Sequence, residues 1–146
     1  MKSLYFDTDI FIYLSTKTSP FYKKVNELTK YCKNKNIAIF TSTETIQEII
    51  HYGKVFLQLP LSIKIALKTL VLIDNLIPAD RELIQKYIEL VKTYLNFTKI
   101  ESRDFIHITS SILYKVDHVI TYDKGFKKFK EITSLTPEEY LQKFED

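Results

Sequence analysis

The chain has 146 residues, the length of one ordinary domain, and its 45 % hydrophobic and 27 % charged residues are typical of a soluble globular protein. No apolar run approaches the roughly 20 residues that span a bilayer, and Asp7 and Asp9 interrupt the first apolar stretch, which argues against a signal peptide. The single cysteine, Cys32, excludes an internal disulfide and a thiolate metal cluster, and we expect it to pack in a helix. We therefore expect one cytoplasmic domain over residues 1–146, with no membrane partner.

The net charge of the chain is +3, from 21 basic and 18 acidic side chains. If five of the acids share one cleft, 21 basic and 13 acidic side chains remain elsewhere, a balance of +8. A basic surface around an acidic cleft suits a bound polyanion. Composition alone favours the simpler interpretation, a lysine-rich solvated surface.

Residues 2–6 form an apolar run that ends in two acids, Asp7 and Asp9. Because Tyr5 and Phe6 are good strand formers, the run predicts a buried strand that opens into a loop. Ligands of α/β proteins bind at that end of a strand. A purely structural interpretation stays open here, in which Asp9 caps the helix that follows.

The rest of the chain alternates helical and strand patterns. Ser-Pro at 19–20 predicts a helix start, and the unbroken apolar run 37–40 predicts a parallel strand buried on both faces. Further strands are expected at 118–121 and around Ile132, whereas residues 71–77 fit either a helix end or a strand. Helices are expected over residues 10–14, 20–33, from 43 onward, 63–72 after a cap at Ser62, after caps at Asp80 and Ser102, and from 136 with a capping box that Glu139 completes. This alternation predicts a three-layer α/β/α domain with a mainly parallel central sheet.

Three acids fall where strands end or helices begin, and such positions share one edge of a parallel sheet. Asp7 follows the first strand, Asp123 follows the strand at 118–121, and Asp104 lies in the first turn of a helix, where the helix dipole should keep it ionised. Two like charges about 4 Å apart repel by ~1 kcal/mol in water and ~4 kcal/mol at an effective dielectric of 20. A cluster of this kind must therefore bind protons or cations. An all-oxygen site suits Mg²⁺ or Mn²⁺, which can activate a water and stabilise charge on a phosphate.

The position of Glu48 in the sequence does not predict that its side chain joins this acidic cluster. Helical spacing puts it roughly opposite Ile46, Ile49 and Ile50, so periodicity alone predicts that it faces solvent. Glu44 lies one turn earlier and could share its side of the helix.

Four blocks of the chain together resemble the PIN-domain family, and in particular single-domain toxin ribonucleases of the VapBC type. The first is an apolar strand, Asp-Thr-Asp and an apolar helix; the second is a Ser before a helix that bears a Glu; the third is an Asp that opens a helix; the fourth is Thr-x-Asp-x-x-Phe after a strand. In this chain they are residues 5–14, Ser42–Ile50, Arg103–Ile108 and Val119–Phe126. Asp9 departs from the family pattern, in which Asn is commoner.

The resemblance implies a PIN-like fold and a divalent-metal-dependent endoribonuclease, in which a metal-activated water hydrolyses RNA phosphodiesters. Thr121 would orient the acids by hydrogen bonding, and Ser42 would do the same near Glu48. The resemblance also implies a cognate antitoxin as partner and a homodimer. The catalytic acids, which would hold Mg²⁺ or Mn²⁺, would be Asp7, Asp104, Asp123 and, directly or through water, Glu48, with Asp9 as a further metal ligand.

Basic and aromatic residues interleave just beyond Asp123. Lys124, Lys127 and Lys128 are candidates to hold the RNA backbone, and we expect Phe126 to be buried. Two histidines lie three residues after proposed site acids, His51 after Glu48 and His107 after Asp104. We interpret both as polar-surface residues rather than metal ligands.

Three other functions remain open at this point. Asp7-Thr8-Asp9 after a strand also resembles a haloacid-dehalogenase-like phosphatase with Asp7 as nucleophile, although that enzyme needs a second acid beside Asp123 and has no use for Glu48. A PIN nuclease that processes RNA without being a toxin would have the same site. A binding module with a degenerate site is disfavoured, because a lost activity should release such costly acids.

Overall fold

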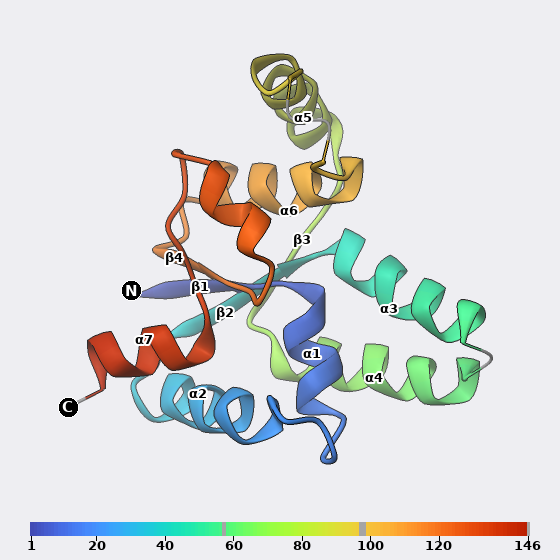
Figure 1. The fold of residues 1–146 in the computed structure, drawn as a ribbon, viewed down its shortest axis with the longest axis vertical. Helices are drawn as coiled ribbons and strands as arrows, with labels where there is room; N and C mark the ends of the chain where they lie inside the picture. Colours follow the sequence, from blue (N-terminus) through green and yellow to red (C-terminus); the bar gives the residue numbers. More distant parts are fainter. Residues whose placement is uncertain (57, 97–98, 146) are drawn as a thin grey trace.

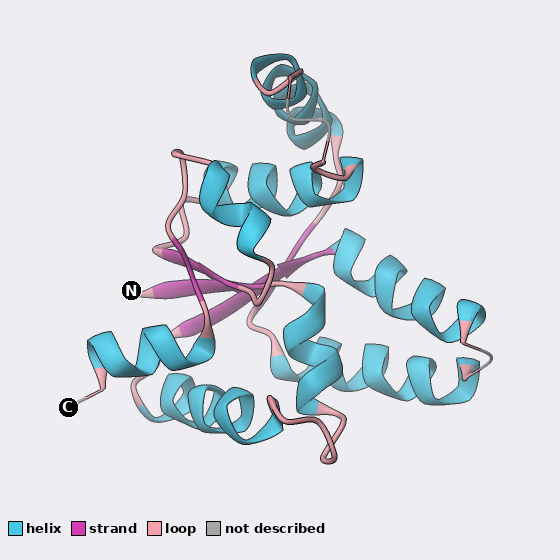
Figure 2. Ribbon diagram, viewed as in Figure 1, coloured by secondary structure: helices cyan, strands magenta, loops and turns pink. Residues whose placement is uncertain are grey.

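The structure is a computed structural model that describes residues 1–56, 58–96 and 99–145. Five strands, seven α-helices and one 3₁₀ helix occur among these residues (Figures 1 and 2). The strands are β1 (Ser3–Phe6), β2 (Ala38–Ser42), β3 (Asn75–Ile77), β4 (His118–Ile120) and β5 (Ser134–Leu135). The helices are α1 (Thr8–Leu14), α2 (Tyr22–Asn34), α3 (Thr43–Val55), α4 (Leu59–Leu72), α5 (Arg81–Thr93), α6 (Ser102–Leu113), the 3₁₀ helix η1 (Lys124–Lys128) and α7 (Pro137–Phe144). In this part of the chain, no helix is long and apolar enough to cross a membrane.

All five strands pair in parallel, in the order β3-β2-β1-β4-β5. The first strand is central, with Tyr5 in register with Phe40 of β2 on one side and with Val119 of β4 on the other. Because β2 and β4 flank β1, the carboxyl ends of these three strands lie side by side. The prediction of a parallel sheet is confirmed.

Helices cover both faces of the sheet, so the predicted three-layer architecture is also confirmed (Figure 1). Side chains alternate along β1: Leu4 and Phe6 join a core with α1, α2, α3, α4 and α7, whereas Tyr5 points to the opposite face. On that face Tyr5 packs in a second core with α5 and α6. Cys32 is buried in the first core, as expected.

Helix boundaries differ from prediction at three serines. Ser19 does not cap α2; its Oγ accepts a hydrogen bond from Phe21 N at 3.2 Å, which makes a turn before the helix begins at Tyr22. Ser62 does not cap α4, because Pro60 is tolerated in the first helical turn and the helix begins at Leu59. Ser102 is the first residue of α6 and makes no capping bond there.

The side chain of Ser62 is buried against α3. A Cβ atom on Gly53 would lie 2.2 Å from Ser62 Oγ, so the two helices approach too closely there for any other residue. Residues 71–77, which fitted either a helix end or a strand, contain both, since α4 ends at Leu72 and β3 follows at Asn75–Ile77. The last strand lies at Ser134–Leu135 rather than at Ile132.

Three caps agree with or refine the sequence interpretation. Asp80 caps α5 by accepting from Leu83 N at 3.0 Å, and Thr136 and Glu139 form the expected capping box of α7. The cap of α1 is Asp7 rather than Asp9, which lies within the first turn of that helix.

Candidate active site

A cavity of about 400 Å³ opens where the carboxyl ends of the central strands meet the helices that follow them. Five acids from four segments line it: Asp7, Asp9, Glu48, Asp104 and Asp123. The structure therefore brings together the acids that the sequence distributes over 117 positions, and it does so at the edge of the sheet where they were expected. A larger cavity between α1, α2 and α4 has no acid in its lining.

Asp7 is buried and held on both oxygens. Its Oδ1 accepts from Thr8 N at 2.8 Å and its Oδ2 from Thr121 Oγ1 at 2.7 Å. The Thr121 hydroxyl also accepts from Asp123 N at 3.0 Å, so this one side chain links the ends of β1 and β4. Burial, which outweighs these hydrogen bonds, raises the pKa of Asp7 above its ordinary value.

Asp9 has one satisfied and one unsatisfied carboxylate oxygen. Oδ2 accepts from Tyr122 N at 3.1 Å, whereas Oδ1 is buried and has no hydrogen-bond partner among the described residues. Burial, and then the charge of Asp7, raise the pKa of Asp9 to about 8. An orphaned, partly desolvated carboxylate oxygen is a position that a proton or a cation would satisfy.

The expectation that the helix dipole keeps Asp104 ionised is wrong. The dipole of α6 should favour its ionised form, but burial and the neighbouring Asp7 and Asp123 raise its pKa to about 7. Desolvation and like charges therefore outweigh the helix terminus here. The protein alone gathers more acids in this cavity than it can ionise at neutral pH.

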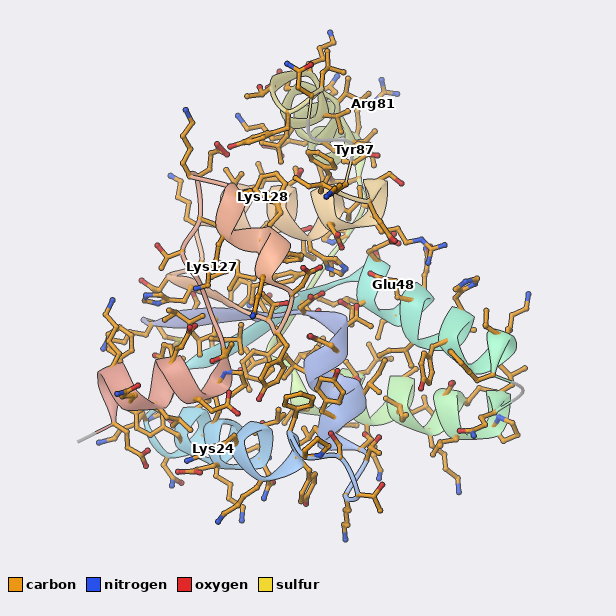
Figure 3. The ribbon with its side chains drawn as sticks, in the orientation of Figure 1. Lys24, Glu48, Arg81, Tyr87, Lys127 and Lys128 are labelled. Atoms are coloured by element: carbon orange, nitrogen blue, oxygen red, sulfur yellow. The ribbon has the colours of Figure 1, made fainter. Side chains whose placement is uncertain are left out.

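Glu48 faces the cavity, contrary to the periodicity of its helix. Its side chain is 22 % exposed, accepts from Thr8 Oγ1 at 3.3 Å and is hydrogen-bonded to His107 Nε2. The buried stripe of α3 is Thr45, Ile49 and Gly53, of which only one is a strong apolar signal. Glu48 follows Thr45 by three positions and so borders this stripe, in the first half of α3 (Figure 3).

His107 was interpreted as a polar-surface residue, and this is wrong. Its side chain is 0 % exposed. Nδ1 lies 2.5 Å from Tyr5 Oη, and Nε2 faces the carboxylates of Glu48 and Asp7. Burial lowers the pKa of His107, but Tyr5, Asp7 and the hydrogen bond to Glu48 together raise it well above its ordinary value. The only sequence signal for this site was its spacing of three residues from Asp104. His51, by contrast, is exposed and lines the cavity.

Ser42 was expected to orient Glu48 by hydrogen bonding, but the two side chains are connected only indirectly. Its Oγ is hydrogen-bonded to Tyr5 Oη at 2.8 Å, and the connection to Glu48 runs through Tyr5 and His107. Tyr5 itself was not predicted as a site residue, because its position in a buried strand indicated only core packing.

The three lysines after Asp123 differ in their surroundings. All three are exposed, but Lys127 donates to the Ser134 carbonyl at 3.3 Å and pairs with Glu139 at 3.6 Å, whereas Lys124 and Lys128 make no ion pair within the described residues. Phe126 is buried, as expected, and Phe129 is buried too. Basic groups in the lining of the cavity come from Arg103 and His51.

The cavity also has an exposed aromatic wall, which we call the α3 wall: Tyr52, Val55 and Phe56. These side chains are 41 %, 57 % and 57 % exposed, and the rings of Tyr52 and Phe56 lie 4.6 Å apart. Exposed aromatic faces beside a polar cavity can stack unpaired bases.

The carboxylates that line the cavity suit a hard divalent cation, but they do not form a complete coordination shell. Among residues 1–56, 58–96 and 99–145, no three His, Cys, Asp or Glu side chains are grouped closely enough to enclose a metal ion by themselves. The available ligands are carboxylate oxygens, one of them orphaned, and Mg²⁺ in proteins typically keeps several waters. A cation here would therefore take part of its shell from water.

The fold and the site define an α/β protein with an acidic centre at the carboxyl ends of a parallel sheet. The PIN domain family model matches residues 4–132, and the chain belongs to this family. Membership removes the basis of the haloacid-dehalogenase-like alternative.

Solved structures with the same fold include VapBC from Salmonella typhimurium in its DNA-bound form (TM-score 0.75, 12 % identity, 94 % of this chain and 99 % of that chain). VapBC2 from Rickettsia felis bound to a promoter DNA fragment gives a TM-score of 0.72 at 18 % identity, over 92 % and 98 % of the two chains. VapC20 of Mycobacterium tuberculosis, a Sarcin-Ricin loop cleaving toxin, gives 0.71 at 12 % identity, over 88 % and 98 %. No curated protein sequence matches the chain. At these identities the likeness establishes the fold.

Proposed function

We propose that this chain is a divalent-metal-dependent endoribonuclease and the toxin of a toxin–antitoxin pair. The observation that carries the proposal is the meeting of five acids around one cavity in a PIN fold. Such a cluster has no structural benefit, because mutual repulsion and burial raise the pKa values of its members. A site that binds cations explains why the acids are there.

Asp7, Asp104 and Asp123 are the proposed ligands of Mg²⁺ or Mn²⁺, with Glu48 acting directly or through water and Asp9 as a fifth acid. A bound ion would supply a water of lowered pKa and would neutralise charge that develops on the phosphate. The orphaned Oδ1 of Asp9 and the all-oxygen donor set support this assignment.

Other side chains and a backbone amide of the protein support the proposed binding of a cation and a phosphate. Thr8 N and Thr121 Oγ1 orient Asp7, so that its carboxylate direction is fixed before any ligand arrives. Asp9 and Asp104, with pKa values of about 8 and about 7, carry protons in the metal-free protein that a cation would displace. Arg103 lines the same cavity and is placed to hold a phosphate.

RNA is the proposed substrate class. The α3 wall offers aromatic faces to unpaired bases, which favours a single-stranded or looped RNA over a regular duplex. The likeness to VapC20, a Sarcin-Ricin loop cleaving toxin, supports the same class.

A protein antitoxin and a second copy of the chain are the proposed partners. The antitoxin is supported by the fold neighbours, which include VapBC complexes and a toxin–antitoxin complex from Klebsiella pneumoniae. The homodimer rests on the family resemblance. A PIN nuclease that processes RNA without being a toxin has no observation in its favour here.

The test combines Mn²⁺ calorimetry with cleavage of a labelled single-stranded RNA. We expect wild type to bind Mn²⁺ and to lose cleavage in EDTA, and Asp104→Asn and Glu48→Gln each to weaken Mn²⁺ binding by at least about 10-fold. Asp117→Asn is the matched control, since Asp117 is exposed and its carboxylate, within the described residues, accepts only from Ser3. Wild-type protein that neither binds Mn²⁺ at millimolar concentration nor cleaves RNA would contradict the proposal.

A further inference from the structure

A buried tyrosine and a buried histidine lie directly behind the acidic cavity. Tyr5 on β1 and His107 on α6 are both 0 % exposed. Tyr5 Oη lies 2.5 Å from His107 Nδ1 and 2.8 Å from Ser42 Oγ, and both contacts are hydrogen bonds. His107 Nε2 is hydrogen-bonded to Glu48 Oε1 and lies 3.6 Å from Asp7 Oδ1. One series of hydrogen bonds thus joins two strands and two helices behind the site.

We propose that Tyr5 and His107 are positioning residues, which hold the carboxylate of Glu48 in the orientation that a divalent cation needs. We call this pair the Tyr5–His107 relay. The proposal rests on the nuclease function proposed above. Neither side chain lines the cavity, so the relay acts on the cation through the acids that His107 contacts, first of all Glu48.

The direction of the hydrogen bonds follows from their chemistry. An ionised carboxylate can only accept, so the hydrogen between His107 and Glu48 is carried by Nε2. The opposite nitrogen, Nδ1, then either accepts from Tyr5 Oη or donates to it, and the tyrosine hydroxyl completes its own bonding with Ser42. Tyr5 gives Nδ1 a partner in both arrangements, which fixes the orientation of the ring so that Nε2 stays aimed at Glu48.

Glu48 is the acid that most needs such support. Its side chain has three rotatable bonds, and it loses more rotamer freedom on ordering than an Asp does. His107 and Thr8 both bond to Oε1, whereas Oε2 makes no hydrogen bond within the described residues. One oxygen is therefore anchored, and the other is left for a cation or its water.

A purely structural role explains the network less well. Buried polar groups cost stability unless every member is satisfied, and apolar side chains could fill the same space. The rings of Tyr5 and His107 already pack edge-on, with centroids 5.7 Å apart. What apolar substitutes could not provide is a donor that reaches Glu48.

The test measures Mn²⁺ affinity by calorimetry in Tyr5→Phe, His107→Leu and His107→Gln. Tyr5→Phe keeps the ring and removes only the hydroxyl. His107→Leu removes the N–H donor, whereas the side-chain amide of His107→Gln keeps one. We expect Tyr5→Phe to weaken Mn²⁺ binding about 10-fold and His107→Leu to weaken it about 10–100-fold, with affinity partly recovered in His107→Gln.

Matched controls come from the same chain. Tyr31→Phe removes another tyrosine hydroxyl, which bonds to the Phe144 carbonyl at 2.8 Å, and His118→Gln changes a histidine that packs on Tyr140. We expect wild-type Mn²⁺ affinity in both. Loss of affinity in Glu48→Gln but not in Tyr5→Phe or His107→Leu would overturn the relay and leave the nuclease proposal standing. Wild type that binds no Mn²⁺ and cleaves no RNA would overturn both.

A second measurement needs no metal and keeps the test independent of folding losses. The ¹⁵N resonances of the histidine rings report which nitrogen carries hydrogen, and the chain has only three histidines. We expect hydrogen on Nε2 of His107 in wild type, and a shifted Nδ1 resonance in Tyr5→Phe, where Nδ1 loses its partner. A spectrum in which Nε2 lacks hydrogen in wild type, or in which Nδ1 is unchanged in Tyr5→Phe, would contradict the relay.

Discussion

Thr121 Oγ1 donates to Asp7 Oδ2 at 2.7 Å and accepts from Asp123 N at 3.0 Å, so that one hydroxyl fixes two of the proposed metal ligands relative to each other. Asp7 directly follows β1 and Thr121 directly follows β4, and the last residues of these strands, Phe6 and Ile120, are paired in register. The pairing of β1 with β4 therefore determines how Asp7 and Thr121 are placed relative to each other.

Thr121→Val removes this hydroxyl and keeps the shape of the side chain. We expect the free energy of unfolding to fall by about 1–2 kcal/mol, because a buried carboxylate oxygen loses its donor. Mn²⁺ affinity should fall about 10-fold, as is typical when a supporting hydrogen bond is lost. Denaturant unfolding and calorimetry measure the two effects. Thr29→Val is the control, since the buried Thr29 hydroxyl donates to the Val25 carbonyl of its own helix, and it should leave Mn²⁺ affinity unchanged.

The fold could be predicted because its signals are local and mutually consistent. Apolar runs between helical patterns indicated the parallel sheet, and acids at strand ends indicated where they would converge. Glu48 could not be predicted from periodicity, since the buried stripe of α3 contains Thr45 and Gly53, which carry little apolar signal. Only the family resemblance selected Glu48.

Tyr5 and His107 were missed for a different reason. A buried tyrosine in a strand and a histidine on a helix look the same in sequence whether or not they meet, and their meeting depends on the packing of α6 against the sheet. Their contact spans 102 positions of the chain. No local pattern records a hydrogen bond of this kind.

Metal-free protein should lose stability as the pH rises from about 4 to about 8. Asp9 and Asp104 have folded pKa values of about 8 and about 7, above their unfolded value near 3.8, so the folded state binds more protons across this interval and stability falls with pH. The raised pKa of His107 acts in the same direction, because stability from its charged form is lost as pH rises through the folded pKa. Thermal unfolding at several pH values, in EDTA, measures the trend.

Saturating Mn²⁺ should cancel this loss, because the cation replaces the protons. We therefore expect the Mn²⁺-induced increase in melting temperature to be larger at pH 8 than at pH 5.5. An increase that is equal at both pH values would mean that the acids with raised pKa values do not share the cation site.

Asp9→Asn should stabilise the metal-free protein at pH 8. The substitution removes one charge from beside Asp7, and the amide oxygen can still accept from Tyr122 N. At ~1.4 kcal/mol for each pKa unit, and with allowance for solvent screening, we expect a gain on the order of 1–3 kcal/mol. The gain should be much smaller at pH 4.5, which is close to the unfolded pKa of 3.8, and Asp117→Asn should give none at either pH. A destabilised Asp9→Asn at pH 8 would mean that its charge is satisfied by a contact other than the Tyr122 amide.

Tyr52→Ala and Phe56→Ala should weaken RNA binding without changing the affinity for Mn²⁺. Each ring is exposed on the α3 wall, and stacking of a base contributes about 1–3 kcal/mol, so each variant should raise the Kd of single-stranded RNA about 10-fold. Fluorescence anisotropy with a labelled RNA measures the change. Leu95→Ala, which alters a 70 % exposed apolar side chain outside the lining of the cavity, should leave RNA affinity unchanged. If RNA affinity is unchanged in both wall variants while the sedimentation of the protein shifts to that of a smaller species, the wall is a contact between copies of the chain instead.

Lys124 and Lys128 should contribute to RNA binding through phosphate contacts, and Lys127 should contribute less. Lys127 is already engaged by Glu139 and the Ser134 carbonyl, whereas Lys124 and Lys128, on the same 3₁₀ helix (Figure 3), make no ion pair within the described residues. Each lost phosphate contact should reduce the slope of log K against log salt concentration by about 0.7 for a single strand. We therefore expect a smaller salt slope in Lys124→Ala and Lys128→Ala.

The control for these variants is Lys24→Ala. Lys24 lies on α2 and pairs with Glu27 at 3.0 Å, on a helix that contributes nothing to the lining of the acidic cavity (Figure 3). Its loss changes the net charge by the same amount as the loss of Lys124 or Lys128, so a general charge effect would alter all three salt slopes equally. A local phosphate contact would alter only the two near Asp123. Equal slopes in all three variants would assign the binding to overall charge and remove these lysines from the RNA site.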